Sequence, residues 1–250
     1  MTTPPISFRR NAVEPVECIK AGWALIKDQY WLFVGMTLIA FLIGQAVPLG
    51  ILLGPMMSGL YIAFLKKRRG EPIEFGTVFK GFDYFGPSLI ATLLHVVPIL
   101  AIVIPAYFLF YVGLILSMAA QAGREEPSAA PVLGVFVMFG LFILVIIAII
   151  LIISIGFTFS YPLIVDRKLA GFDAVKVSFK AAMANFWRLF GMLVLTGLLN
   201  LGGVLLCYVG VFLVLPIGYA AIQAAYEQVF GLYNPEDAMS NLPPPPPTFN

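Results

Sequence analysis

Residues 127–165 read PSAAPVLGVFVMFGLFILVIIAIILIISIGFTFSYPLIV and contain no Asp, Glu, Lys or Arg. A helix needs about 20 apolar residues to cross the hydrocarbon core of a bilayer, so this run exceeds the length of one crossing. Three further charge-free runs of similar length lie at residues 29–65, 84–123 and 189–226. The alternation predicts an all-α polytopic membrane protein.

Composition excludes a soluble globular class. Apolar residues make up 60% of the 250-residue chain and charged residues only 11%, whereas soluble domains contain about 25% charged residues. The first apolar run begins near Tyr30, behind a polar segment of mixed charge, and is longer than the apolar region of a cleavable signal peptide. We therefore expect the first span to remain part of the protein.

The basic residues set the predicted topology. Fourteen of the 15 Lys and Arg residues fall into three clusters between the apolar runs, at residues 9–27, 66–80 and 167–188. The positive-inside rule places all three clusters in the cytoplasm, so an even number of spans must separate them. We predict six spans in three hairpins, with both termini cytoplasmic, the side of the C-terminus following from parity.

The predicted domain organisation is simple. A single membrane domain covers residues 14–232, between an N-terminal tail at residues 1–13 and a disordered proline-rich tail at residues 233–250. Within this domain, residues 47–50 (VPLG) contain Pro and Gly, which favour a tight turn in the first hairpin. Residues 75–165 form the middle hairpin.

An internal repeat is predicted from matches at a fixed offset of 156 residues. The matched pairs are Ile19/Val175, Lys20/Lys176, Gly22/Ser178, Trp23/Phe179, Tyr30/Phe186, Trp31/Trp187, Gly35/Gly191 and Met36/Met192. The copies cover residues 16–65 and 172–230. Both begin on the cytoplasmic side, which predicts a parallel repeat. The alternative is a bias of any membrane-entry segment towards Trp, Lys and Gly.

Each predicted hairpin follows an interfacial amphipathic helix. Apolar residues recur at spacings of three and four before each apolar run, which gives the helix one apolar face. They are Val16, Ile19, Trp23, Ile26 and Tyr30; then Phe75, Val78, Phe82 and Phe85; then Phe172, Val175, Phe179, Ala182 and Phe186. Helices of this kind lie in the membrane interface before the chain turns into the bilayer.

Several short motifs carry a family resemblance. They are AGW at 21–23, GPMMSGLY at 54–61, KKRRGE at 66–71, VFKGF at 78–82, DRKL at 166–169, DAVKVS at 173–178, LPI at 215–217 and AY at 225–226. Over about residues 14–232, the chain resembles the bacterial six-span inner-membrane proteins of the YciC-like kind. The same broad group includes the membrane part of some glycerophosphodiester phosphodiesterases. The resemblance implies a multi-pass protein of the bacterial cytoplasmic (inner) membrane, and implies no reaction, substrate or catalytic residue.

His95 is the only histidine and lies inside an apolar run. An ionisable side chain within the membrane is a candidate proton relay or ligand contact. The alternative is a neutral imidazole that donates a hydrogen bond to a facing helix. No Asp or Glu in the predicted spans is available to exchange a proton with it.

Four more residues complete the candidate intramembrane polar site. Gln45 and Asn200 lie near the outer turns of the two repeat copies, where they form a symmetric polar pair or simply join helices and cap turns. Pro55 and Pro216 occupy comparable places in the second and sixth spans. They indicate either broken helices with a substrate-binding backbone or plain kinks.

Two features suggest partners. The membrane-surface basic residues are predicted to attract anionic lipid head groups at the cytoplasmic face, or else only to set the topology. They are Lys66, Lys67, Arg68, Arg69, Arg167 and Lys168. Pro243–Pro247 must form polyproline II, which a polyproline-binding partner could recognise, or which belongs to a free tail.

The sequence lacks the motifs of common enzymes, including a nucleotide-binding glycine loop, a nucleophile elbow and metal-ligand spacing. We predict a non-enzymatic protein without a cofactor or a nucleic-acid partner, which assembles with itself, as a homo-oligomer, or with other proteins in the envelope. The alternative is a transporter or lipid-handling permease with a site between the repeat halves.

Overall fold

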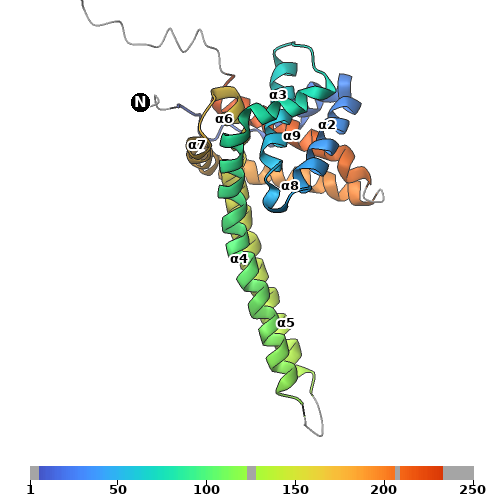
Figure 1. The fold of residues 1–250 in the computed structure, drawn as a ribbon, viewed down its shortest axis with the longest axis vertical. Helices are drawn as coiled ribbons and strands as arrows, with labels where there is room; N and C mark the ends of the chain where they lie inside the picture. The colour runs from blue at the N-terminus through green and yellow to red at the C-terminus, as the bar shows by residue number, and fades with distance from the viewer. Residues whose placement is uncertain (1–5, 123–127, 206–208, 233–250) are drawn as a thin grey trace, which may run out of the picture.

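The computed structural model describes residues 6–122, 128–205 and 209–232, and all regular structure in these ranges is helical (Figure 1). The prediction of an all-α protein is confirmed. Five helical stretches are long and apolar enough to cross a membrane. They are Pro15–Gln45, Phe75–Ala119, Ala130–Arg167, Phe186–Val204 and Gly210–Phe230. The predicted proline-rich tail and its Pro243–Pro247 run lie outside the described residues.

The first hairpin contains the predicted tight turn. The chain runs through α1 (Pro15–Ile26), η1 (Lys27–Gln29), α2 (Tyr30–Gln45), η2 (Pro48–Gly50) and α3 (Leu53–Arg68). Leu49 and Gly50 both have φ of 63°, and Pro48 fixes the backbone before them. At 16 residues, α3 is the one predicted span that is not among the five long apolar stretches.

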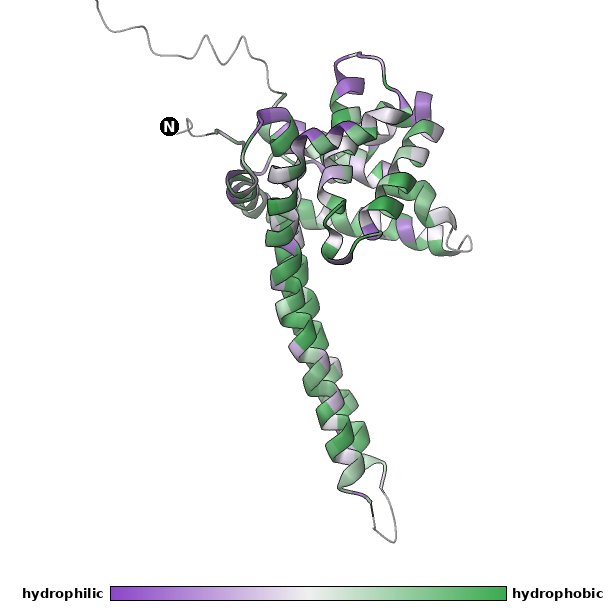
Figure 2. Ribbon diagram, in the orientation of Figure 1, coloured by the Kyte–Doolittle hydropathy of each residue, from purple (hydrophilic) through white to green (hydrophobic). Residues whose placement is uncertain are grey.

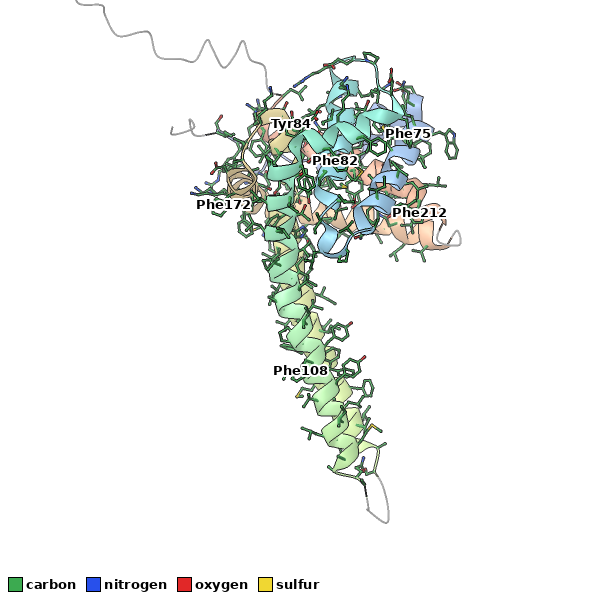
Figure 3. All side chains as sticks on the ribbon, in the orientation of Figure 1. Phe75, Phe82, Tyr84, Phe108, Phe172 and Phe212 are labelled. Carbon is green, nitrogen blue, oxygen red and sulfur yellow. The ribbon has the colours of Figure 1, made fainter. Side chains whose placement is uncertain are left out.

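The middle hairpin is much longer than the first. It comprises η3 (Phe75–Tyr84), α4 (Phe85–Ala119), α5 (Ala130–Phe157) and α6 (Ser160–Arg167). The 35 residues of α4 span about 52 Å at a rise of 1.5 Å per residue. The α4–α5 hairpin therefore projects far beyond the other helices, with side chains radiating on all sides (Figures 1 and 3).

The last hairpin follows α7 (Gly171–Ala184) and consists of α8 (Phe186–Leu205) and α9 (Val209–Phe230). Together with α1–α3, η3 and α6 it forms a compact head at one end of the projecting hairpin (Figure 1). Hydrophilic residues gather at the end of the head that faces away from the hairpin tip, whereas the hairpin is hydrophobic along its length (Figure 2).

The short helix before each hairpin packs against the second helix of another hairpin. η3 packs on α3, and α7 packs on α5 and α6. α1 packs on α9, so the last hairpin contacts the helix that precedes the first hairpin. Small residues allow these close approaches. A Cβ atom added to Gly22 on α1 would lie 2.6 Å from the backbone nitrogen of Ala221 on α9. On α7, Ser178 Oγ donates to the carbonyl of Gly156 at 2.7 Å.

The N-terminal residues before α1 also pack against the head. The backbone nitrogen of Arg9 donates to the carbonyl of Val229 at 2.9 Å. Buried Asn185, between α7 and α8, accepts from the Ala12 nitrogen at 2.8 Å and donates to the Arg9 carbonyl at 3.1 Å. We call residues 6–14 the N-terminal strap, because they tie α7 and α8 to the end of α9.

Candidate functional site

His95 joins the two helices of the middle hairpin. Its Nε2 lies 3.4 Å from Ser154 Oγ on α5, and its ring stacks on Phe157 with centroids 4.7 Å apart. Both contacts come from the helix that α4 faces. His95 thus contacts a neighbouring helix, and neither contact involves an acidic group.

The other four residues of the predicted polar site lie on separate helices. Gln45 is exposed at the end of α2, and Asn200 Nδ2 donates to the Thr196 carbonyl of its own helix at 2.8 Å. Pro55 and Pro216 are buried within α3 and α9. In the described ranges, no hydrogen bond or ring contact joins any two of these four residues or His95, so the structure does not bring the predicted site together.

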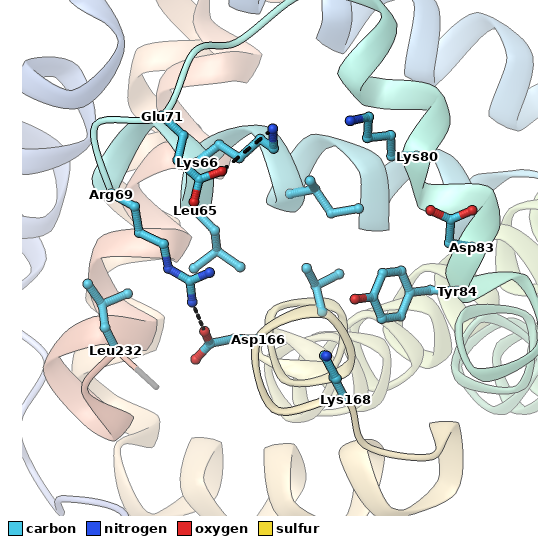
Figure 4. A pocket seen from close by; sticks show the side chains of 12 residues that line it. Leu65, Lys66, Arg69, Glu71, Lys80, Asp83, Tyr84, Asp166, Lys168 and Leu232 are labelled. Atoms are coloured by element: carbon cyan, nitrogen blue, oxygen red, sulfur yellow. Dashed lines mark hydrogen bonds and ion pairs between the residues drawn. The ribbon is translucent and has the colours of Figure 1, made fainter. Parts of the chain in front are cut away.

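A pocket of about 690 Å³ instead opens at the hydrophilic end of the head, between α3, η3 and α6 (Figure 4). This volume is in the range of about 300–1,000 Å³ that is typical of small-ligand sites. The pocket is lined by Ile62, Leu65, Lys66, Arg69, Glu71, Lys80, Asp83, Tyr84, Val165, Asp166, Lys168 and Leu232. Four basic and three acidic side chains thus meet over an apolar floor.

The floor and one wall come from the end of α3 and the turn that follows it. Arg69 Nη2 lies 3.0 Å from Asp166 Oδ1, and Lys66 Nζ lies 3.6 Å from Glu71 Oε2 (Figure 4). Gly70, with φ of 72°, reverses the chain between the two pairs. Because each cation faces a carboxylate, this part of the pocket is close to neutral.

Asp166 is the centre of a buried polar network. Its side chain is fully buried at the end of α6, and Oδ2 accepts a hydrogen bond of 2.7 Å from the hydroxyl of Tyr226 on α9. Arg167 Nε lies 3.5 Å from the same oxygen, and Nη2 donates to the Phe230 carbonyl at 3.1 Å. With Arg69 on the other oxygen, this carboxylate ties the ends of α3, α6 and α9 together.

Lys80 and Lys168 differ from the other cations of the pocket. Both are exposed, one on η3 and one after α6, and both reach towards the pocket in Figure 4. No acidic side chain of the described ranges forms an ion pair with either lysine. Lys168 also adopts the left-handed conformation, with φ of 52°, where glycine or asparagine is usual after a helix.

Acidic side chains lie against five of the six basic residues that were predicted to face anionic lipid. Besides the three cations already described, Lys67 Nζ lies 3.1 Å from Asp28 Oδ2, and Arg68 Nη2 lies 2.6 Å from Glu227 Oε2. Lys168 is the sixth. Lys80 was not singled out from the sequence, because its only local signal is its place in the basic cluster before the apolar run at residues 84–123.

Neither a cluster of metal ligands among the described residues nor a related protein was found that would assign a role to this pocket. No three His, Cys, Asp or Glu side chains within residues 6–122, 128–205 and 209–232 are grouped so that they could hold a metal ion. Comparisons with protein-family models, curated proteins and solved structures found no match to this chain.

Proposed function

We propose that this chain is a non-enzymatic, six-span protein of the bacterial inner membrane, with both termini in the cytoplasm, that acts by assembling with itself or with partner proteins. The projecting α4–α5 hairpin carries the proposal. At about 52 Å, α4 is far longer than the roughly 30 Å of a hydrocarbon core, whereas α2 and α3, with 16 residues each, reach only about 24 Å.

Hairpins as unequal in length as the first and the middle one cannot end at the same two membrane surfaces. If the short hairpins occupy the bilayer, the distal part of α4–α5 extends past its outer face, because tilts above about 40° are unusual. That part is apolar and exposed, with Phe108 on α4 67% and Met138 on α5 68% accessible. Apolar surface of this extent outside the hydrocarbon core needs a protein partner to cover it.

A photo-crosslinking side chain in place of Phe108 tests the assembly. We expect it to form a covalent adduct of defined mass with a second copy or another membrane protein in intact cells. The matched control is the same replacement at Phe172 on α7, which is 62% exposed but lies on the head. Adducts with lipid alone at residue 108, or equal protein adducts at both positions, would contradict the proposal.

Cysteine labelling tests the six-span topology separately. In a variant with Cys18 and Cys207 replaced by Ser, a membrane-impermeant maleimide should label Leu49→Cys and Ser128→Cys in intact cells, because both lie at outer turns. Gly70→Cys should react only after permeabilisation. Labelling of Leu49→Cys from the inside would mean that the first hairpin does not cross the bilayer.

We also infer a parallel repeat of three units. Gly22, Gly81 and Ser178 occupy one position of the short helices α1, η3 and α7, at offsets of 59 and 156 residues. Each of them meets the second helix of another hairpin, at Ala221, Gly59 and Gly156. Equivalent small residues at equivalent interfaces support duplication over a shared compositional bias.

The pocket at the end of the head favours lipid handling as a second candidate function. It lies beside the start of α4, where a chain that spans the membrane would enter the interface. Unlike the dispersed intramembrane residues, its side chains converge on one volume (Figure 4). Lipid handling here requires no site between the repeat halves.

A further inference from the structure

We propose that the pocket between α3, η3 and α6 binds the phosphodiester of a phospholipid head group, with Lys80 and Lys168 as the cationic ligands. The inference rests on the membrane location proposed above and extends the second candidate function by naming a ligand class. The observation behind it is that two lysines from different elements line a single cavity of about 690 Å³.

Among the residues that the structure describes, Lys80 and Lys168 are the lining cations without an ion pair, whereas the other two are paired. Arg69 and Lys66 face Asp166 and Glu71 at 3.0 and 3.6 Å. A free ammonium group that lines a concave site is a point-charge ligand for a phosphate oxygen. Lys80 comes from η3 and Lys168 follows α6, so the two lysines line the same pocket from different elements (Figure 4).

The charge of the pocket favours a diester over a monoester. With the two ion pairs neutral, Lys80, Lys168 and Asp83 leave a net charge of +1 in the lining. A phosphodiester carries one negative charge and matches this value, whereas a phosphomonoester carries about −1.5 to −2 at neutral pH. The carboxylate of Asp83 disfavours the second negative charge.

The apolar part of the lining favours a lipid over a soluble diester. Ile62, Leu65 and Val165 form an apolar surface below the charged rim, and Tyr84 stands at the start of α4. Tyrosine is enriched at the level of the head groups, because its ring is apolar and its hydroxyl is polar. A glycerophospholipid would place its phosphate at the rim and its glycerol and first methylenes along this surface.

The backbone at Lys168 fits a ligand role rather than a structural one. A non-glycine residue at φ of 52° is strained by about 1 kcal/mol, and such strain is concentrated at functional sites. Glycine would end α6 with less strain but without a charge. Lys168 instead places a charge in the lining of the pocket.

Titration of the purified full chain in detergent with phosphatidylglycerol, read by native mass spectrometry, tests the proposal. We expect one phosphatidylglycerol to be retained, and the Lys80→Gln/Lys168→Gln double variant to bind it at least tenfold more weakly, because each lysine contributes a charged hydrogen bond. The matched control is Lys176→Gln/Lys180→Gln, which removes two exposed lysines of α7 outside the pocket and should leave the affinity unchanged.

Two further ligands show whether the phosphodiester and the acyl chains each contribute to the affinity. Diacylglycerol with the same acyl chains lacks the phosphodiester and should bind at least tenfold more weakly. Glycerophosphoglycerol lacks the acyl chains and should also bind at least tenfold more weakly. Diacylglycerol binding as tightly as phosphatidylglycerol would overturn the phosphate assignment, and glycerophosphoglycerol binding as tightly would overturn the lipid assignment.

A third variant guards against a folding artefact. Lys168→Gly suits the left-handed backbone, so it should unfold at a temperature equal to or above that of the unmodified chain while binding phosphatidylglycerol more weakly. Unchanged binding in this variant and in the double variant would overturn the proposal. Both outcomes are independent of the cross-linking at residue 108, so failure of this inference and failure of the assembly proposal are distinguishable.

Discussion

Replacement of Asp166 by Ala is expected to destabilise the protein by about 2–3 kcal/mol, less than for a fully buried ion pair, because Arg69 is 44% exposed and keeps access to water. The substitution leaves the guanidinium groups of Arg69 and Arg167 and the hydroxyl of Tyr226 without their shared acceptor. Because these groups belong to three different helices, the ends of α3, α6 and α9 should separate together. The free energy of unfolding, from denaturation by SDS in mixed micelles, measures the effect.

Asp173→Ala is the matched control for this prediction. Asp173 is an exposed carboxylate in the first turn of α7, and its interaction with the helix dipole is worth at most about 1 kcal/mol. Asp166→Asn should fall between the two, since the amide retains an acceptor but loses the charge. A cost for Asp166→Ala no larger than that of Asp173→Ala would show that the network does not hold the helix ends together.

Gly59→Ala is expected to cost about 3 kcal/mol, at the upper end of overpacking substitutions. The added Cβ would clash with the carbonyl oxygen of Val78 on η3, a backbone atom that no side-chain rotation can move. Gly81 on η3 closes the same contact from the other side, against the Pro55 carbonyl. α3 and η3 must therefore move apart, which the same unfolding measurement would detect.

The control for this steric effect is Gly197→Ala on α8. A Cβ atom at Gly197 would meet no atom within 4 Å, so the substitution should be neutral or stabilise the helix by up to about 1 kcal/mol. Equal effects of the two substitutions would mean that helix propensity, rather than the contact between α3 and η3, determines the result at Gly59.

The charge-free runs and the spacing of apolar residues predicted the helices well. The turn at Pro48 and the short helices before each hairpin lie where the sequence placed them. The runs did not distinguish an exposed helix from a buried one. In α3, 11 of 16 residues are buried, whereas in α4 only four of 35 are. Apart from the basic end of α3, both helices are apolar around their whole circumference, so hydropathy alone carries no information about which neighbour covers them.

The polar contacts of the pocket could not be predicted either, because sequence patterns do not specify which helices pack together. Positive-inside reasoning located Arg69 and Arg167 in basic clusters, but their shared partner Asp166 is 97 residues from Arg69 along the chain. Likewise His95, Gln45 and Asn200 each looked like members of one polar site. Their placement on different helices depends on helix rotation and crossing geometry, which single-sequence periodicity does not specify.

The N-terminal strap imposes an order on biogenesis. Residues 6–14 precede α1, yet they contact Gln228 and Val229 near the end of α9, so these contacts can form only after α9 has been synthesised. Until α9 has been synthesised, α1 lacks its main packing partner, and buried Cys18 lacks its hydrogen bond of 3.1 Å to Gln228 Oε1. A polypeptide that stops before α9 would thus leave this face of α1 uncovered, so the two ends of the described fold depend on each other.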